Sequence, residues 1–335
     1  KSLHRPAPAS FQLPAIRETV QAAPEIHTRF ISSRQNIATH AASLVELGDG
    51  RIRAFWFAGS REGAEDVEIR TAVFDPMRSQ WGGEASVTDR HKTQRALLRF
   101  VKKLGNPVAY RTPDGTLWLY YVTVSVGGWA GSSITAMTSS DDGATWNPAQ
   151  RLVTSPFIDI STLVKGTPFM YGDGSIGLPV YHEFIGKFGE LLRIAPNGEI
   201  IDKQRQSSGK LAIQPVVLIQ NSQQAMVVMR HTGPAPKRVI ATTTADAGQH
   251  WSIPTKTALA NPDAAVAGVS LPDGLMLLAI NDTETNREVL SLVASSDDGA
   301  IWQTVYRLED QRGQSSAPAR YTQIAAQLAQ ATDSG

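Results

Sequence analysis

Residues that suit acid–base or ion-pair chemistry recur at regular distances from a series of Asp-Gly turns. About ten residues before the turn glycines stand His40, Asn106, Lys165, Gln214 and Asp263. A second group follows the turns, mostly by about seven to twelve residues: Arg61, Glu62, Asp66, Trp129, Tyr181, His182, Glu183, Arg230 and Asn281, with Arg287 just beyond. Carboxylates and histidine suit proton transfer, arginine suits a bound carboxylate, and tryptophan suits stacking on a sugar ring.

Two kinds of turn organise the chain around these residues. The first kind ends at a glycine that follows an aspartate, and it occurs at Gly50, Gly115, Gly174 and Gly274. Between the last two, an Asn-Ser pair around Asn221 takes the fourth place in the series. The second kind reads "SSDDGATW" from Ser139 to Trp146 and returns as "SSDDGAIW" and, more loosely, as "TADAGQHW". In such a turn the aspartate accepts backbone N–H bonds, the glycine takes a positive φ and the tryptophan packs beneath.

The alternation of the two turns predicts a repeated four-stranded unit. Each unit runs strand, Asp-Gly turn, strand, longer loop, strand, Asp-type turn, strand, with a period near fifty residues. This is the pattern of a β-propeller blade. Five blades are visible, and "ATDSG" at Gly335 resembles the first turn of a sixth, so we expect an all-β, six-bladed propeller whose last blade is incomplete. The stretch 92–105 is expected to be a helix that stops at Gly105.

Both kinds of turn lie on one rim of a propeller, so the acid–base and ion-pairing residues are expected to meet at the opposite rim. Each also has a structural interpretation. His40 at a strand start suits a packed structural histidine, and Glu62 and Asp66 suit solvated or capping carboxylates. Arg230 and Arg287 suit ion pairs with Glu183 or Asp282, and Trp129 suits a loop plug. A ligand site at this rim is the interpretation that explains why nearly every blade contributes a polar group.

Composition narrows the class of partner. The 335 residues carry 32 basic and 31 acidic side chains, a net charge of +1, and no cysteine. We therefore expect no nucleic-acid partner and no thiol chemistry, and the sequence shows no membrane span and no metal-ligand cluster. We expect a glycan or acidic sugar as ligand, no cofactor, an extension or tether over residues 1–24, a single propeller domain over 25–335, and a periplasmic or secreted location.

The repeated turns resemble the sialidase superfamily, whose propellers carry Asp-boxes or BNR repeats. The segments "THAASLVELGDG", "FWFAGSREGAEDVEI", "VSVGGWAGSS" and "LPVYHEFIGKFGELLR" are similar to a bacterial branch of sialidase-like proteins. The resemblance implies an exo-α-sialidase type of glycoside hydrolase. Such enzymes use three arginines on the sugar carboxylate, an aspartate as acid/base, and a tyrosine activated by a glutamate.

The resemblance carries over to this chain only in part. It gives Asp66 the acid/base place, and Arg230 and Arg287 two of the three arginine places. Tyr181 and Glu183 lie two apart, on one strand face, but in a different blade from the family's tyrosine; Tyr321 is a second candidate. His40 stands where the family has its first arginine, which favours acid–base chemistry on a uronic acid or a neutral sugar.

Three functions remain open at the level of the sequence. The first is a sialidase-like exo-glycosidase with Asp66, His40, Tyr181 and Glu183 as catalytic residues. In it an acidic sugar is held by Arg61, Arg230, Arg287 and Lys165. The second is a uronate-directed hydrolase or lyase at the same residues. The third is a non-catalytic carbohydrate-binding propeller in polysaccharide processing.

Overall fold

The computed structural model describes residues 9–13, 26–32, 37–155, 159–207 and 211–312. The chain divides into two compact units. The N-terminal unit comprises residues 17–167 with 317–335, and the C-terminal unit comprises residues 168–316 with 1–16. The strands of the described residues form five sheets, and the adjacent strands within each are antiparallel.

The N-terminal unit contains two of these sheets. The first has the order β1-β2-β3-β4, with β5 also paired to β3, and the second has the order β6-β7-β8-β9. The bounds of the strands are β1 Ala38–Glu46, β2 Ile52–Gly59, β3 Glu68–Asp75, β4 Gln80–Trp81, β5 Ala85–Asp89, β6 Lys103–Arg111, β7 Leu117–Val124, β8 Ser132–Ser139, β9 Gln150–Arg151 and β10 Leu163–Val164. A short 3-10 helix covers Trp129–Gly131.

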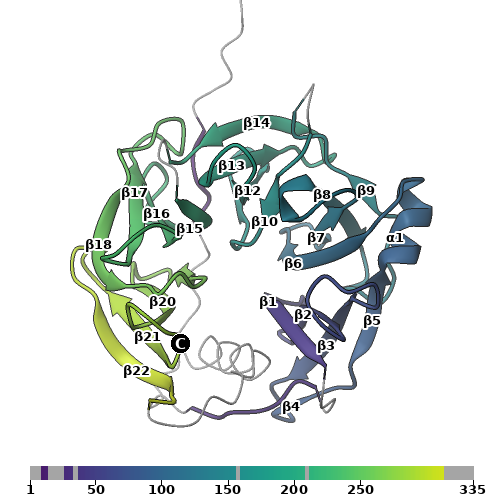
Figure 1. Cartoon of the computed structure of the whole chain (residues 1–335), viewed down its shortest axis with the longest axis horizontal. Helices are drawn as coiled ribbons and strands as arrows, with labels where there is room; N and C mark the ends of the chain where they lie inside the picture. The colour runs from purple at the N-terminus through teal and green to yellow at the C-terminus, as the bar shows by residue number, and fades with distance from the viewer. Residues whose placement is uncertain (1–8, 14–25, 33–36, 156–158, 208–210, 313–335) are drawn as a thin grey trace, which may run out of the picture. The chain divides into compact units, whose positions relative to one another are not determined.

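The C-terminal unit contains the other three sheets, each read in chain order. Figure 1 shows β15, β16, β17 and β18 in this order across one sheet; β19 to β22 follow the same order, and β11 pairs with β12 in the sheet that continues through β13 and β14. The bounds are β11 Phe169–Met170, β12 Ile176–His182, β13 Phe188–Ile194, β14 Ile200–Arg205, β15 Ala212–Ile219, β16 Ala225–His231, β17 Arg238–Thr244, β18 Thr255–Ala260, β19 Ala267–Ser270, β20 Met276–Asn281, β21 Val289–Ser295 and β22 Gln303–Asp310.

These sheets confirm the predicted blade, but not the predicted number of blades. Five sheets are present among the described residues, where six blades were expected. The sixth was inferred from one Asp-Ser-Gly turn at Gly335 without a second turn after it, whereas a blade needs two hairpin turns. That turn lies outside the described residues, as does Tyr321.

The Asp-Gly turns have the predicted chemistry. Gly115 adopts a φ of +92°, a conformation that costs glycine little and other residues more. The Asp114 carboxylate accepts hydrogen bonds from the Thr116 N–H at 3.0 Å and the Thr112 hydroxyl at 2.6 Å. In the fourth turn Asn221 takes the same role, because its Oδ1 accepts from the N–H groups of Gln223 and Gln224 at 2.9 and 2.8 Å.

The second kind of turn is equally regular. Asp141 accepts from the Ser139 hydroxyl at 2.7 Å, and from the N–H and hydroxyl of Thr145 at 2.8 and 2.6 Å. These bonds, those from Thr145 foremost, lower the pKa of Asp141 to about 2. Trp146 packs edge-on against Phe55 of β2, with ring centroids 5.9 Å apart. Asp141 thus has a structural role, since it holds the turn together.

Each unit has an apolar core made by the strand faces. In the N-terminal unit Phe55, Leu119 and Tyr121 are fully buried with neighbours from β3 and β6. In the C-terminal unit Val228 and Leu278 belong to a cluster of buried residues drawn from β15 to β21. Because β7 is buried at every position and β2 and β12 at nearly every position, the polar residues at the strand ends are the ones left to build a site.

The helix was predicted in the right region with the wrong bounds. Helix α1 covers Arg90–Leu97, begins at Asp89, whose side chain accepts from the Lys92 N–H, and ends at Leu98 in a left-handed conformation. Gly105, the expected stop, lies in β6. The apolar spacing that suggested a longer helix reflects Val101 and Leu104, which are buried ahead of and within β6. No helix in the described residues has the length and apolar character that a membrane crossing requires.

Part of the expected tether is packed against the C-terminal unit. Phe11 is only 3% exposed and forms an isolated antiparallel bridge with Tyr171. Its N–H donates to the Ser222 carbonyl, and the Gln12 N–H donates to the Met170 carbonyl, at 2.8 and 2.9 Å. Residues 9–12 therefore join two neighbouring sheets of this unit, a role that the tether interpretation of residues 1–24 did not include.

Candidate functional site

A backbone irregularity recurs at the predicted positions before the turns. Asn106, Gln214 and Asp263 have φ values of +45°, +56° and +64°, and Ala41, next to His40, has +54°. The strand register shifts at this point in β1, β6 and β15. A bulge of this kind turns side chains out of the regular alternation. Of the polar residues predicted ten before the turns, His40, Asn106 and Gln214 therefore occupy or adjoin a bulge, while Asp263 shares only the positive φ.

The C-terminal unit gathers its predicted residues around Arg230. The Arg230 guanidinium lies at the end of β16 and donates to Asp263 Oδ1 at 2.6 Å and to Gln214 Oε1 at 3.4 Å. Arg287 donates to the backbone carbonyl of Asp263 at 2.6 Å. Two arginines thus meet at one aspartate, Arg230 at its carboxylate and Arg287 at its backbone carbonyl. Guanidinium groups gathered in this way suit an anionic ligand.

Glu183 belongs to the same cluster by its electrostatics. It is half-buried and follows β12 by one residue. Burial raises the pKa of the Glu183 carboxyl, an effect opposed by the positive charges of Lys187 and Arg230 and supported by Asp263. A carboxyl with a raised pKa is the kind of group that donates a proton near neutral pH. Glu183 is therefore the best-suited general acid among the predicted residues.

Tyr181, His182 and Asn281 have structural contacts in this unit. Tyr181 is 3% exposed, so its ring faces the protein interior. His182 stacks on Phe188 with centroids 4.8 Å apart, and its Nε2 accepts from the Ile185 N–H at 3.0 Å. The Asn281 amide donates to the carbonyls of Arg287 and Val289. His182 and Asn281 fix the loops that present Glu183 and Arg287.

In the N-terminal unit Asp66 is an exposed carboxylate held by its own loop. It accepts from the N–H and the hydroxyl of Ser60, both at 2.9 Å. These bonds lower the pKa of Asp66, with a smaller contribution from the positive charge of Arg61. The predicted capping role is present, and the ionised carboxylate suits a base better than an acid. The resemblance alone gave no sign of the Ser60 contact.

Trp129 lies in a cation–π contact that the sequence did not indicate. The Lys103 ammonium is 4.0 Å from the centre of its ring. Burial lowers the pKa of Lys103, while Glu62 acts in the opposite direction. Gly105 lies beneath the indole, since a side chain there would come within 2.7 Å of it. Lys103 is the first residue of β6, three residues before the bulge at Asn106. Its nearness to this predicted position is the sequence signal that could have identified Lys103 as a site residue.

His40 and Lys165 complete the predicted residues of this unit. The His40 ring stacks on Phe57 with centroids 5.4 Å apart, which agrees with the structural interpretation. Lys165 follows β10 and is half-buried. Burial lowers the pKa of the Lys165 ammonium to about 8, and within the described part of the chain this ammonium makes no hydrogen bond or ion pair. An ammonium in this state gains from a bound anion.

Arg230 forms an ion pair that the sequence did not predict. The expectation named Glu183 or Asp282 as partners of Arg230 and Arg287, and the side-chain pair that forms is Arg230 with Asp263. Asp263 lies between β18 and β19 and has a left-handed backbone with a φ of +64°, outside the alternation of a strand. The pair of Arg230 with Asp263 is one that the sequence did not indicate.

Comparisons with known proteins agree with the turns and sheets. A family model described as "BNR repeat-like domain" matches residues 50–327. The Hadza microbial sialidase Hz136 is 16% identical at a TM-score of 0.68, over 81% of this chain and 59% of that one. The NanB sialidase from Streptococcus pneumoniae is 11% identical at 0.62, over 85% and 63%. The intramolecular trans-sialidase from Ruminococcus gnavus is 10% identical at 0.62, over 81% and 85%.

These similarities establish the fold. The chain is an all-β propeller like those of the three sialidases, which confirms the predicted fold class. It spans less than two thirds of the length of the first two. A comparison with curated proteins finds no match.

Proposed function

The chain belongs to the BNR repeat-like domain family, and we propose that it is a sialidase-like exo-glycosidase acting on an acidic terminal sugar of a glycan. The observation that carries the proposal is the cluster in the C-terminal unit. There Arg230 and Arg287 converge on Asp263, beside Glu183, whose pKa is raised. Guanidinium groups suit the sugar carboxylate, and a protonated carboxyl suits the leaving oxygen.

Glu183 is the proposed general acid. It donates its proton to the glycosidic oxygen as the bond from this oxygen to the anomeric carbon breaks. Water supplies the hydroxyl that joins the anomeric carbon, and its proton passes to a carboxylate base. Asp66 of the N-terminal unit keeps the acid/base role suggested by the resemblance as a separate proposal, and the Ser60 bonds lower the pKa of its carboxyl.

The other predicted residues have supporting parts in the proposal. Arg230 and Arg287 bind the acidic group, and Lys165 of the N-terminal unit keeps its predicted ligand-binding role as a separate proposal. His40 and Tyr181 keep their predicted catalytic roles as proposals. The remaining residues are proposed to contact the sugar or hold its loops: Arg61, Glu62, Asn106, Trp129, His182, Gln214, Asp263 and Asn281.

The experiment is a substrate comparison with matched variants. Purified protein is assayed on fluorogenic α-sialoside, β-glucuronide and β-galactoside. We expect turnover of an acidic glycoside only, with Glu183→Gln and Arg230→Ala each losing at least about a hundredfold in kcat/KM. Arg312→Ala is the control, because Arg312 is exposed and its side chain pairs, among the residues that the structure describes, with Asp310 at the end of β22. Turnover of the galactoside alone would contradict the acidic-sugar assignment.

A non-catalytic carbohydrate-binding propeller is the second candidate. It is favoured by Tyr181, which is 3% exposed and so poorly placed for attack on a sugar, and by His40, which stacks on Phe57. This candidate predicts saturable binding of sialic acid or glucuronic acid that Arg230→Ala weakens, with no hydrolysis of any of the three glycosides. The periplasmic or secreted location stays a prediction.

A further inference from the structure

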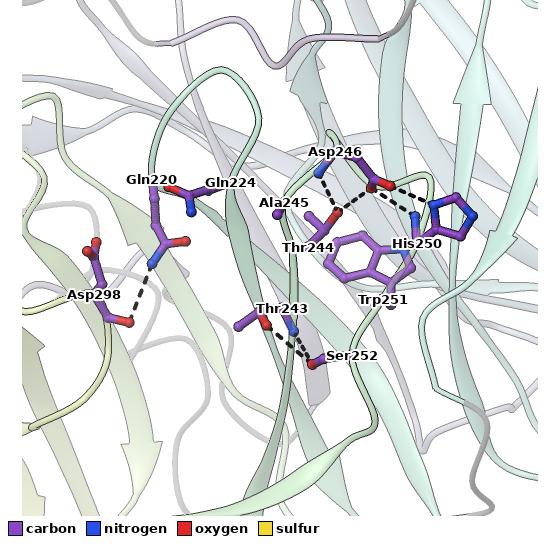
Figure 2. A pocket seen from close by; sticks show the side chains of 10 residues that line it. All are labelled: Gln220, Gln224, Thr243, Thr244, Ala245, Asp246, His250, Trp251, Ser252 and Asp298. Atoms are coloured by element: carbon purple, nitrogen blue, oxygen red, sulfur yellow. Dashed lines mark hydrogen bonds and ion pairs between the residues drawn. The ribbon is translucent and has the colours of Figure 1, made fainter.

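A groove of about 620 Å³ opens beside the second-kind turn of the sheet β15–β18. Its walls include Gln220 and Gln224 at the β15–β16 turn, Asp246, His250 and Trp251 at the β17–β18 turn, and Asp298 at the β21–β22 turn. Figure 2 shows these side chains around one opening, with the Trp251 ring drawn below the Asp246–His250 pair.

The groove lies far from the cluster proposed to bind the acidic sugar. Gln224 directly precedes β16, and Arg230 lies near the opposite end of the same strand. At about 3.3 Å per residue, six residues separate the two places by about 20 Å. The groove is therefore a separate feature of the C-terminal unit, and a ligand bound there would be independent of the proposed reaction.

His250 is the first unusual feature of the groove. In the turn of Trp146 the residue before the tryptophan is Thr145, whose hydroxyl bonds Asp141 at 2.6 Å. His250 holds the same position, and its Nδ1–H donates to Asp246 Oδ2 at 2.6 Å, while its N–H donates to Oδ1 at 2.9 Å. The imidazole is 87% exposed. A threonine would satisfy the turn, so the fold does not require this oriented aromatic ring.

Asp298 is the second unusual feature. Its counterpart in the earlier turn, Asp142, pairs with Arg111 at 2.8 Å. The Asp298 carboxylate has no hydrogen bond or ion pair within the residues that the structure describes, and only its backbone carbonyl accepts, from the Gln220 amide at 3.4 Å. The Gln224 carbonyl oxygen accepts from Asn221, which leaves the Gln224 amide nitrogen as a donor toward the groove.

These groups match an uncharged sugar. A free carboxylate and amide groups bond sugar hydroxyls, and an indole and an imidazole offer flat surfaces for the C–H face of a pyranose ring. The carboxylates of Asp246 and Asp298 oppose an anion. The groove volume lies within the usual range for small-molecule sites. We propose that this groove is a second saccharide-binding site, specific for an uncharged hexose unit of a glycan.

The test is ligand-detected saturation-transfer NMR on the whole chain. The probes are methyl β-D-galactopyranoside and methyl α-D-glucopyranoside, with methyl β-D-glucuronide as the anionic comparison and glucosamine as the cationic one. The variants are His250→Thr, which restores the residue of the earlier turn and so keeps the turn bonds, and Asp298→Ala. Asp202→Ala removes an exposed carboxylate on β14 of the same unit and is the matched control.

We expect one of the uncharged glycosides to bind, with affinity reduced about tenfold in His250→Thr and in Asp298→Ala and unchanged in Asp202→Ala. Turnover of an acidic glycoside, if present, should be the same in all three variants. The proposal is overturned if neither uncharged glycoside gives a signal. It is also overturned if the signal persists unchanged in both groove variants, or if the glucuronide or glucosamine binds more tightly than both.

Discussion

Replacing Phe11 with alanine should release residues 9–12 from the C-terminal unit. Phe11 is 3% exposed and lies 5.4 Å from the Phe169 ring and 5.5 Å from the Tyr171 ring, measured between centroids. Truncation of a buried phenylalanine costs about 3–5 kcal/mol. Because the segment is short and terminal, we take the lower end, about 3 kcal/mol, which corresponds to a change of about a hundredfold in the docking equilibrium.

Hydrogen exchange followed by mass spectrometry measures this equilibrium directly. The N–H groups of Phe11, Gln12 and Gly172 donate to the carbonyls of Ser222, Met170 and Ser10 at 2.7 to 2.9 Å, and all three bonds need the docked segment. Their protection should fall about a hundredfold in Phe11→Ala. Trp251 packs on the same apolar cluster and gives a fluorescence signal of the change.

The control is Leu13→Ala, since Leu13 belongs to the same segment and is 49% exposed. Hydrogen exchange at the same N–H groups in Leu13→Ala should match that of the unmodified protein. Equal protection in Phe11→Ala and Leu13→Ala would show that the aromatic contacts do not hold the segment in place.

Three further predictions concern the turns and the titratable groups. Gly143→Ala should lower the free energy of unfolding by about 1–2 kcal/mol in thermal unfolding, because Gly143 has a φ of +89° and a Cβ would come 3.1 Å from Arg53 Nε. The control is Gly83→Ala, which should change the stability little because the space around Gly83 is open. The raised pKa of Glu183 makes ionisation costlier in the folded state, so stability should fall as the pH rises from about 4.5 through the folded pKa. Glu183→Gln should lose this fall in urea titrations, and an identical pH profile would contradict the assignment. Labelling of Lys165 by an amine-reactive reagent should reach half its maximal rate near pH 8, and a midpoint near 10.5 would disprove its burial effect.

Local turn chemistry is the part of the fold that the sequence predicted best. Asp141 and Gly143 form their turn through bonds within a few residues, so the pattern of types and spacing determines the geometry. Asn221 shows the same point, because an amide oxygen replaces the aspartate of the Asp-Gly turns and keeps the bonds. The number of blades was less secure, since a lone turn at Gly335 was counted as a blade.

The contacts of the candidate site were harder to predict. The partner of Arg230 is Asp263, 33 residues away, and the contact depends on the left-handed backbone of Asp263, which no local pattern specifies. Lys103 was missed because its position over Trp129 depends on the β6–β7 register. The sequence thus predicted which residue types gather near the strand ends, while long-range backbone geometry decides which side chains pair.

The most direct test of the proposed function is turnover of a fluorogenic α-linked sialoside by the pure protein, beside Asp66→Asn and the Arg312→Ala control. We expect release of the fluorophore by the unmodified protein and by Arg312→Ala, and its loss in Asp66→Asn. No release above the blank, or equal release in all three proteins, would contradict a sialidase-like reaction that uses Asp66.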